Sequence, residues 1–246
     1  MSSDFIHTLS NILSNLEFVD LSHRLEEDIP TFPTHSHFYH LKWENPDDPA
    51  TMFQFMMHEH NGTHVDAPAH YLREGVGNRE DAWIDAIPLQ TLIGPCKVLQ
   101  LAGFDNRNLL SKCHIEDWEA NHVRIQKDDI VLLNFGWHKR WTTSKERYQF
   151  AKDWPGLTRD AALYLAEKEV KAVGTDCIGL DCCGSTEIPA HDVLLARNIL
   201  IMENLANLDL LPDESFFIAF PLKIKQGSGS PIRAVSLIPK TGGSMT

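Results

Sequence analysis

Three histidines and one aspartate lie within eleven residues of the sequence, in the stretch HNGTHVDAPAH that begins at His60. His60, His64 and Asp66 share one parity, so an extended strand would direct their side chains to the same side. A fully extended chain from His60 to Asp66 spans about 20 Å, too far for both ends to hold an ion whose ligand atoms lie about 2 Å from it. The chain must therefore bend, and Asn61-Gly62 allows a bend because both residues tolerate a positive φ.

Two imidazoles and one carboxylate are a ligand set of catalytic Zn²⁺, Mn²⁺ and Fe²⁺ sites that leave a position open for water. His70 lies beyond Pro68 and could orient or deprotonate that water, since a histidine pKa of about 6.5 suits a general base. A histidine-rich surface loop is the alternative, because the chain contains 13 histidines. A helical HExxH protease motif is excluded: the segment from His60 to His64 lacks the glutamate and contains a glycine that disfavours a helix.

A second candidate group is Glu203, which closes the apolar run ILIMEN at 199–204, with His191 twelve residues earlier. A carboxylate at the end of a buried strand is costly unless it is paired or bound to a metal. His191 could approach it if the chain turns between the two, but pairing of Glu203 with an arginine is equally consistent with the sequence. Together with the first cluster, these residues make five candidate ligands, enough for a binuclear site bridged by Asp66.

The composition is that of an ordinary globular protein. The 246 residues are 43% hydrophobic and 23% charged, without a run of about 18 apolar residues. The net charge of -12 repels phosphate and anionic lipid, so neither nucleic acid nor a membrane is an expected partner. No basic residue precedes the apolar positions of the N-terminal stretch, so we predict no secretory signal and expect a cytoplasmic protein. Five cysteines without a CxxC pair indicate reduced thiols.

One domain spanning 1–246, with an N-terminal helical extension at 1–17, is predicted because the chain has no repeat or low-complexity block. Mixed strands with few helices indicate an α/β or α+β domain with a central, partly barrel-like mixed sheet. Apolar and β-branched runs predict strands at 97–101, 129–135, 170–176, 199–204, 215–224 and 231–238. Helices are predicted at 4–15, 157–170 and 189–198, and flexible segments at 44–50, 225–231 and the termini.

The stretch HNGTHVDAPAH resembles the HxGTHxDxPxH signature of the cyclase superfamily, which includes bacterial kynurenine formamidases and isatin hydrolases. Further similarity extends from about Phe18 to Pro239 and includes VDLSH, DDIVLLNFGW, ENLANLDLLP and AFPLKIKQGSGSPIRAVSL. The resemblance implies a swivelling β/β/α domain, usually dimeric or tetrameric, with part of the pocket supplied by a neighbouring subunit. The identical signature positions are His60, Gly62, Thr63, His64, Asp66, Pro68 and His70.

The resemblance also implies a function, namely hydrolysis of C–N bonds of aryl formamides or cyclic amides with one or two divalent ions, zinc or manganese, per subunit. Such an ion lowers the pKa of bound water from about 15.7 towards ~7. The added segment at 137–156 looks closer to the isatin-hydrolase branch than to the compact formamidases. The implied metal ligands are His60, His64 and Asp66 for a first ion and His191 and Glu203 for a second, with His70 as the catalytic histidine.

Aromatic side chains on the predicted loops could build an apolar slot for a small planar substrate, although core packing is the alternative for each of them. The hydroxyl of Thr63 could anchor a ligand, or this residue could be only a β-former. The candidate substrate contacts are Phe32, Trp83, Trp137 and Thr63. A lyase or dehydratase, a lactone hydrolase on the same metal site, or a metal-binding protein without activity stay open as alternatives.

Overall fold

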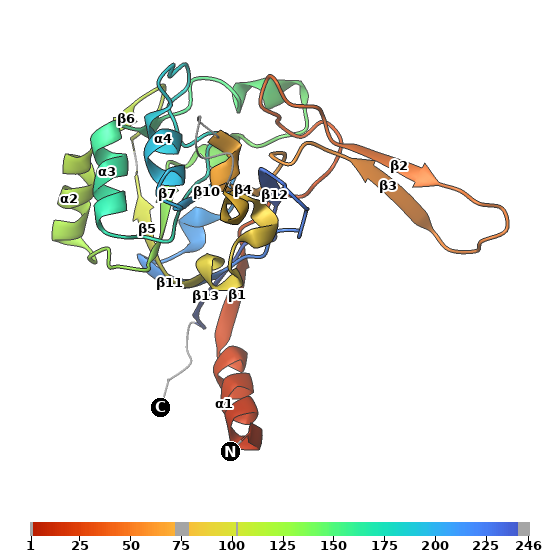
Figure 1. The fold of residues 1–246 in the computed structure, drawn as a ribbon, viewed down its shortest axis with the longest axis horizontal. Coiled ribbons are helices and arrows are strands. Elements are labelled where there is room, and N and C mark those ends of the chain that lie inside the picture. The colour runs from red at the N-terminus through yellow and green to blue at the C-terminus, as the bar shows by residue number, and fades with distance from the viewer. Residues whose placement is uncertain (1, 72–78, 102, 241–246) are drawn as a thin grey trace.

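Nine strands form one curled mixed sheet at the centre of the protein (Figure 1). The structure is a computed structural model, and it describes residues 2–71, 79–101 and 103–240. In spatial order the strands are β1 (Leu16–Asp20), β13 (Val235–Pro239), β11 (Glu214–Ile218), β5 (Ile93–Gln100), β7 (Ile130–Asn134), β9 (Ala172–Thr175), β10 (Leu200–Glu203), β4 (His64–Asp66) and β12 (Gly229–Pro231). The central run from β5 to β10 is parallel, and the pairs on either side of it are antiparallel.

The four α-helices of the described ranges are α1 (Ser2–Ser14), α2 (Lys112–Asn121), α3 (Arg159–Glu167) and α4 (Pro189–Leu195). Helices α2, α3 and α4 pack on one face of the sheet, whereas α1 extends away from the body (Figure 1). Successive residues of β7 point to opposite faces. Val131 and Leu133 therefore join the core under the helices, and Ile130 and Leu132 join the second core inside the curl. The predicted α/β fold with a partly barrel-like mixed sheet and few helices is confirmed.

Each of the six predicted strands and three predicted helices overlaps an observed element, although the bounds differ by several residues. Thr158 is the N-cap of α3, as predicted, and its hydroxyl accepts the Ala161 N–H. Helix α2 was not predicted, because most of its side chains are polar and only Ile115 and Trp118 are buried. The sequence signal for α2 is Ser111, which precedes these two apolar positions as N-cap.

Two segments that were predicted to be flexible lie between or within paired strands. Residues 44–50 lie in the connection of a hairpin between β2 (Tyr39–Trp43) and β3 (Met52–Met56), which projects from the body (Figure 1). For 225–231 the prediction is wrong, because its end forms β12 and pairs with β4. The Glu59 carboxylate fixes the start of this strand by accepting the N–H groups of Ser228 and Gly229. Glycine and serine here allow close backbone approach rather than mobility.

The remaining regular elements are short. Strands β6 (Leu109–Leu110) and β8 (Gly156–Leu157) pair in parallel beside the main sheet. A 3₁₀ helix, η1 (Pro68–Tyr71), follows β4 directly and carries His70. Six further 3₁₀ helices span Glu80–Ala82, Ile84–Ala86, Leu89–Leu92, Trp137–Arg140, Lys145–Gln149 and Leu208–Leu210.

Candidate active site

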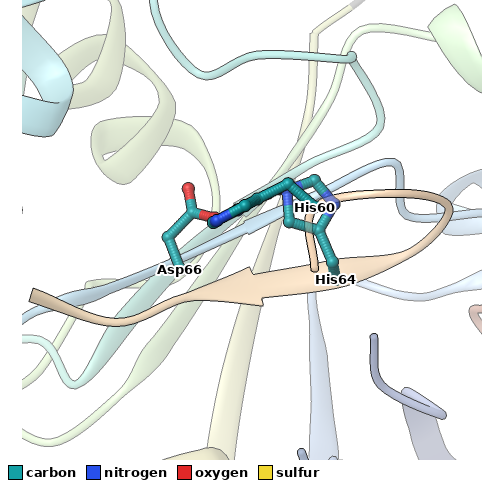
Figure 2. A group of neighbouring side chains, drawn as sticks. All are labelled: His60, His64 and Asp66. Atoms are coloured by element: carbon teal, nitrogen blue, oxygen red, sulfur yellow. The ribbon is translucent and has the colours of Figure 1, made fainter. Parts of the chain in front are cut away.

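The predicted bend before β4 is present and brings three candidate ligands together (Figure 2). Gly62 has a φ of 66°, the left-handed conformation that glycine adopts without a Cβ clash. Beyond this turn, Nδ1 of His60 lies 2.6 Å from Oδ1 of Asp66, and Nε2 of His64 lies 3.4 Å from the same oxygen. The Nδ1 atom of His64 is 2.9 Å from the Gly62 carbonyl oxygen, so its Nε2 atom is the one turned to Asp66.

Glu203 and His191 approach the same carboxylate from two other elements. Glu203 ends β10 directly opposite His64 in the antiparallel pair, and the two side chains lie 3.6 Å apart. His191 lies on α4 with its Nε2 atom 3.4 Å from Oδ2 of Asp66 and 3.5 Å from Oε1 of Glu203. Among the described residues, Glu203 is paired with these two imidazoles and not with an arginine. The structure thus brings all five predicted ligands together around Asp66.

His70 lies beside this group on η1, immediately after β4. Its ring is stacked on that of His60, with ring centroids 3.9 Å apart. Two sets of potential ligand atoms, each within 4.8 Å, share Asp66: one adds His60 and His64, and the other adds His70 and His191. By geometry, His70 could therefore act either on a proton or as a ligand.

The chemistry of these residues fits a divalent cation. Asp66 has no exposed surface, and its Oδ2 atom, although 3.4 Å from Nε2 of His191, accepts no hydrogen bond from the described residues. A buried carboxylate oxygen in this position is costly unless a cation compensates for the lost hydration. Imidazole nitrogen and carboxylate oxygen are ligands of Zn²⁺ and Mn²⁺. The orphaned oxygen therefore supports a metal at Asp66.

The cluster shifts the protonation of its own members. Burial raises the pKa of Glu203 to about 7, with a further contribution from the Asp66 charge. Burial lowers the pKa of His64, but the hydrogen bond and charge of Asp66 outweigh it, and the net shift is upward. Burial also lowers the pKa of His70 to about 4, against the charge of Asp66. Oppositely shifted groups in one cavity are typical of functional sites.

A cavity of about 540 Å³ opens over the cluster. Of the four predicted substrate contacts, Phe32 lines this cavity, whereas Trp83, Trp137 and Thr63 are not among its lining residues. Trp137 is 1% exposed in the core, where its Nε1–H donates to the Phe150 carbonyl. Thr63 is buried behind the cluster and binds backbone, accepting the His23 N–H and donating to the carbonyl of Asn204.

The sequence analysis did not assign several residues that line the cavity. Tyr71 follows the signature directly, and its ring centroid is 4.8 Å from that of His191. Trp154 ends the added segment at 137–156 and packs edge-on against Phe32, with ring centroids 6.0 Å apart. The adjacency of Tyr71 to His70 was a usable signal. The placement of Trp154 depends on contacts between distant segments, which no local pattern contains. The other unassigned lining residues include His35, Ile178, Asp181 and Ile188.

Comparison with known proteins identifies the family to which the chain belongs. Residues 19–182 match the family described as putative cyclase. The chain is 37% identical over 207 residues to an isatin hydrolase of Roseibium aggregatum, covering 79% of this chain and 78% of the relative. It is 30% identical over 224 residues to a kynurenine formamidase of Bacillus thuringiensis, covering 89% of this chain and 96% of the relative. The chain therefore belongs to the cyclase family.

Solved structures agree in fold. A crystal structure of an isatin hydrolase bound to the product analogue thioisatinate superposes with a TM-score of 0.86 at 31% identity, covering 98% of this chain and 100% of that chain. The prediction of an enzyme of the hydrolase class is confirmed by these relatives. In the described part of the chain, no helix is long and apolar enough to cross a membrane.

Proposed function

We propose that this protein hydrolyses the C–N bond of a small cyclic amide or aryl formamide at a divalent metal site. The observation that carries the proposal is the buried cluster around Asp66, where three elements deliver imidazoles and carboxylates to one point below an open cavity. The proposed ligands are His60, His64, Asp66, His191 and Glu203, and His70 is the proposed catalytic residue.

The chain's own residues can transfer the proton and hold the substrate beside the metal site. A divalent cation at Asp66 would supply an activated water and polarise the amide carbonyl. His70 lines the cavity beside His60, where its imidazole can take a proton from the water and give it to the leaving nitrogen. Phe32, Tyr71 and Trp154 form aromatic walls that can hold a flat ring and exclude water.

An isatin-like substrate has more support than N-formylkynurenine. The identity to the isatin hydrolase is 37%, against 30% for the formamidase. We expect metal-loaded protein to turn over isatin with a kcat/KM at least ~10-fold above that for N-formylkynurenine, a difference of about 1.4 kcal/mol in transition-state binding. Parallel steady-state assays on isatin, N-formylkynurenine and simple lactones measure this ratio. Turnover of the lactone alone would establish the lactone hydrolase instead, and no turnover with full metal content would contradict the proposal.

The ion is proposed to be zinc or manganese, with one or two ions per subunit. The position of Asp66 supports two ions, because its Oδ1 atom faces His64 and its Oδ2 atom faces His191, and one carboxylate can bridge two metals. Elemental analysis of protein purified without chelators measures the identity and the ratio. The cytoplasmic location and the single domain over 1–246 stay predictions.

A homodimer or homotetramer is proposed from the exposed apolar surface of the hairpin. The hairpin stands away from the body (Figure 1), yet Trp43, Phe53 and Phe55 are 53%, 50% and 61% exposed. By the strand register, Phe53 and Phe55 lie on one face of the hairpin and Trp43 on the other, and exposed large apolar side chains of this kind are typical of an interface. We expect size-exclusion chromatography with light scattering to give a mass of at least twice 27.9 kDa. A mass of one chain at micromolar concentration would contradict the assembly.

A further inference from the structure

We infer that Asp181 is the positioning residue of the metal site, because it fixes the ring of His191 with Nε2 facing the other ligands. The inference rests on the proposed function, since it concerns a ligand of the proposed ion. Asp181 is 6% exposed and lies in the loop that joins β9 to α4.

The carboxylate of Asp181 accepts three hydrogen bonds from the start of α4. Its Oδ1 atom lies 2.7 Å from the Ala190 nitrogen, and its Oδ2 atom lies 3.2 Å from the His191 nitrogen. Oδ2 is also 2.5 Å from Nδ1 of His191. An ionised carboxylate only accepts, so Nδ1 must carry the proton of this bond. In the neutral form that metal ligation requires, the imidazole would then have its lone pair on Nε2, the atom that lies 3.4 Å from Asp66.

The same loop also positions a second ligand. The N–H of Leu180 donates to Oε1 of Glu203 over 2.8 Å, next to the residue that holds His191. Two consecutive residues therefore set the orientation of ligands that come from a helix and from a strand. Movement of this loop would displace both ligands at once.

The loop is itself held by the segment that ends the 137–156 region. Nε1 of Trp154 donates to the carbonyl of Asp181 over 2.7 Å, and the N–H of Leu157 donates to the carbonyl of Leu180 over 3.1 Å. Gly156 approaches so closely that a Cβ atom there would lie 2.1 Å from the Cys182 nitrogen. These contacts make the loop a fixed support rather than a mobile edge.

Strain at the start of α4 is consistent with this support. Ile188, the N-cap of α4, has φ 39° and ψ 54°, a left-handed conformation that is rare for a β-branched residue. Such a conformation persists only where surrounding contacts impose it, and it is typical of functional sites. The hydrogen bonds from Ala190 and His191 to Asp181 lie directly after this residue and supply that constraint.

The test is the zinc affinity of Asp181→Asn, measured on metal-free protein by competition with a chelating indicator. We expect a loss of about 10- to 100-fold, the usual effect of removing the partner of a ligating histidine. The absorption spectrum of the Co²⁺-loaded variant is expected to change as well, because His191 is free to rotate. Unchanged zinc affinity in the folded variant would overturn the inference. Failure of the wild-type protein to bind either zinc or manganese would instead overturn the proposed function.

The matched control is Asp160→Asn. Asp160 lies in the first turn of α3 rather than in a loop, but like Asp181 it is a carboxylate that accepts a backbone N–H, that of Lys112. The Asp160→Asn variant is expected to have a lower melting temperature and an unchanged zinc affinity. If Asp181→Asn does not fold, ¹⁵N NMR of the zinc-loaded wild-type protein decides: a His191 ring protonated at Nδ1 and bound through Nε2 supports the inference, and the opposite arrangement overturns it.

Discussion

His64→Ala is expected to purify without its full complement of divalent metal and without measurable hydrolase activity. His64 lies between Asp66 and Glu203, with its Nε2 atom 3.4 and 3.6 Å from their carboxylates. Its removal leaves those buried acids without the imidazole and takes one ligand from the first metal set. Since loss of an outer-shell partner already costs about 10- to 100-fold in metal affinity, loss of a ligand should cost at least ~100-fold. Elemental analysis and a chelator titration measure this.

The control for this experiment is His122→Ala. His122 is exposed, and its partner Asp213 lies outside the cavity. This variant is expected to keep the wild-type metal content and activity. If His64→Ala also retained full metal content and turnover, the assignment of His64 as a ligand would be wrong.

His70→Ala is expected to keep bound metal but to lose about 10²- to 10⁴-fold in kcat, the usual contribution of a general acid–base group. The reason is the position of His70, which lines the cavity and stacks on His60 without belonging to the His60, His64 and Asp66 set. Metal content and steady-state kinetics of the same preparation must be measured together.

The geometry of the site also allows His70 to be a metal ligand. It belongs to the second potential ligand set with Asp66 and His191. Loss of one metal ion per subunit in His70→Ala would show that it is a ligand, and its assignment as the catalytic residue would fall. His122→Ala serves again as the control, because it removes an imidazole that lies outside the cavity.

The first cluster could be predicted because its geometry is local. The parity of His60, His64 and Asp66 and the flexibility of Asn61-Gly62 are properties of one short segment, and the structure has the turn there. Predicting that Glu203 and His191 join this cluster required more than a local pattern. The register of β10 against β4, which places Glu203 opposite His64, depends on sheet pairing between distant segments. Family resemblance implied Glu203 and His191 as ligands without that register, while the sequence pattern alone left an arginine partner equally acceptable.

What the sequence could not provide are the side-chain contacts made by loops. Asp181 has no local pattern that distinguishes an orienting carboxylate from an ordinary helix cap, and in the structure it is hydrogen-bonded to both the backbone at the start of α4 and the ring of the proposed ligand His191. Aromatic residues present the same difficulty. Trp137 and Trp154 both lie in the added segment, yet Trp137 is in the core and only Trp154 reaches the cavity. Composition does not encode which side of a loop faces inward.

Anomalous diffraction from crystals of chelator-free protein, recorded on both sides of the zinc and manganese absorption edges, tests the metal site most directly. The account predicts a peak within bonding distance of Nε2 of His64 and a carboxylate oxygen of Asp66. A second peak near His191 and Glu203 would indicate two ions. Metal-replete crystals whose only anomalous peaks lie away from Asp66 would contradict the account, because the orphaned carboxylate would then have no cation to explain it.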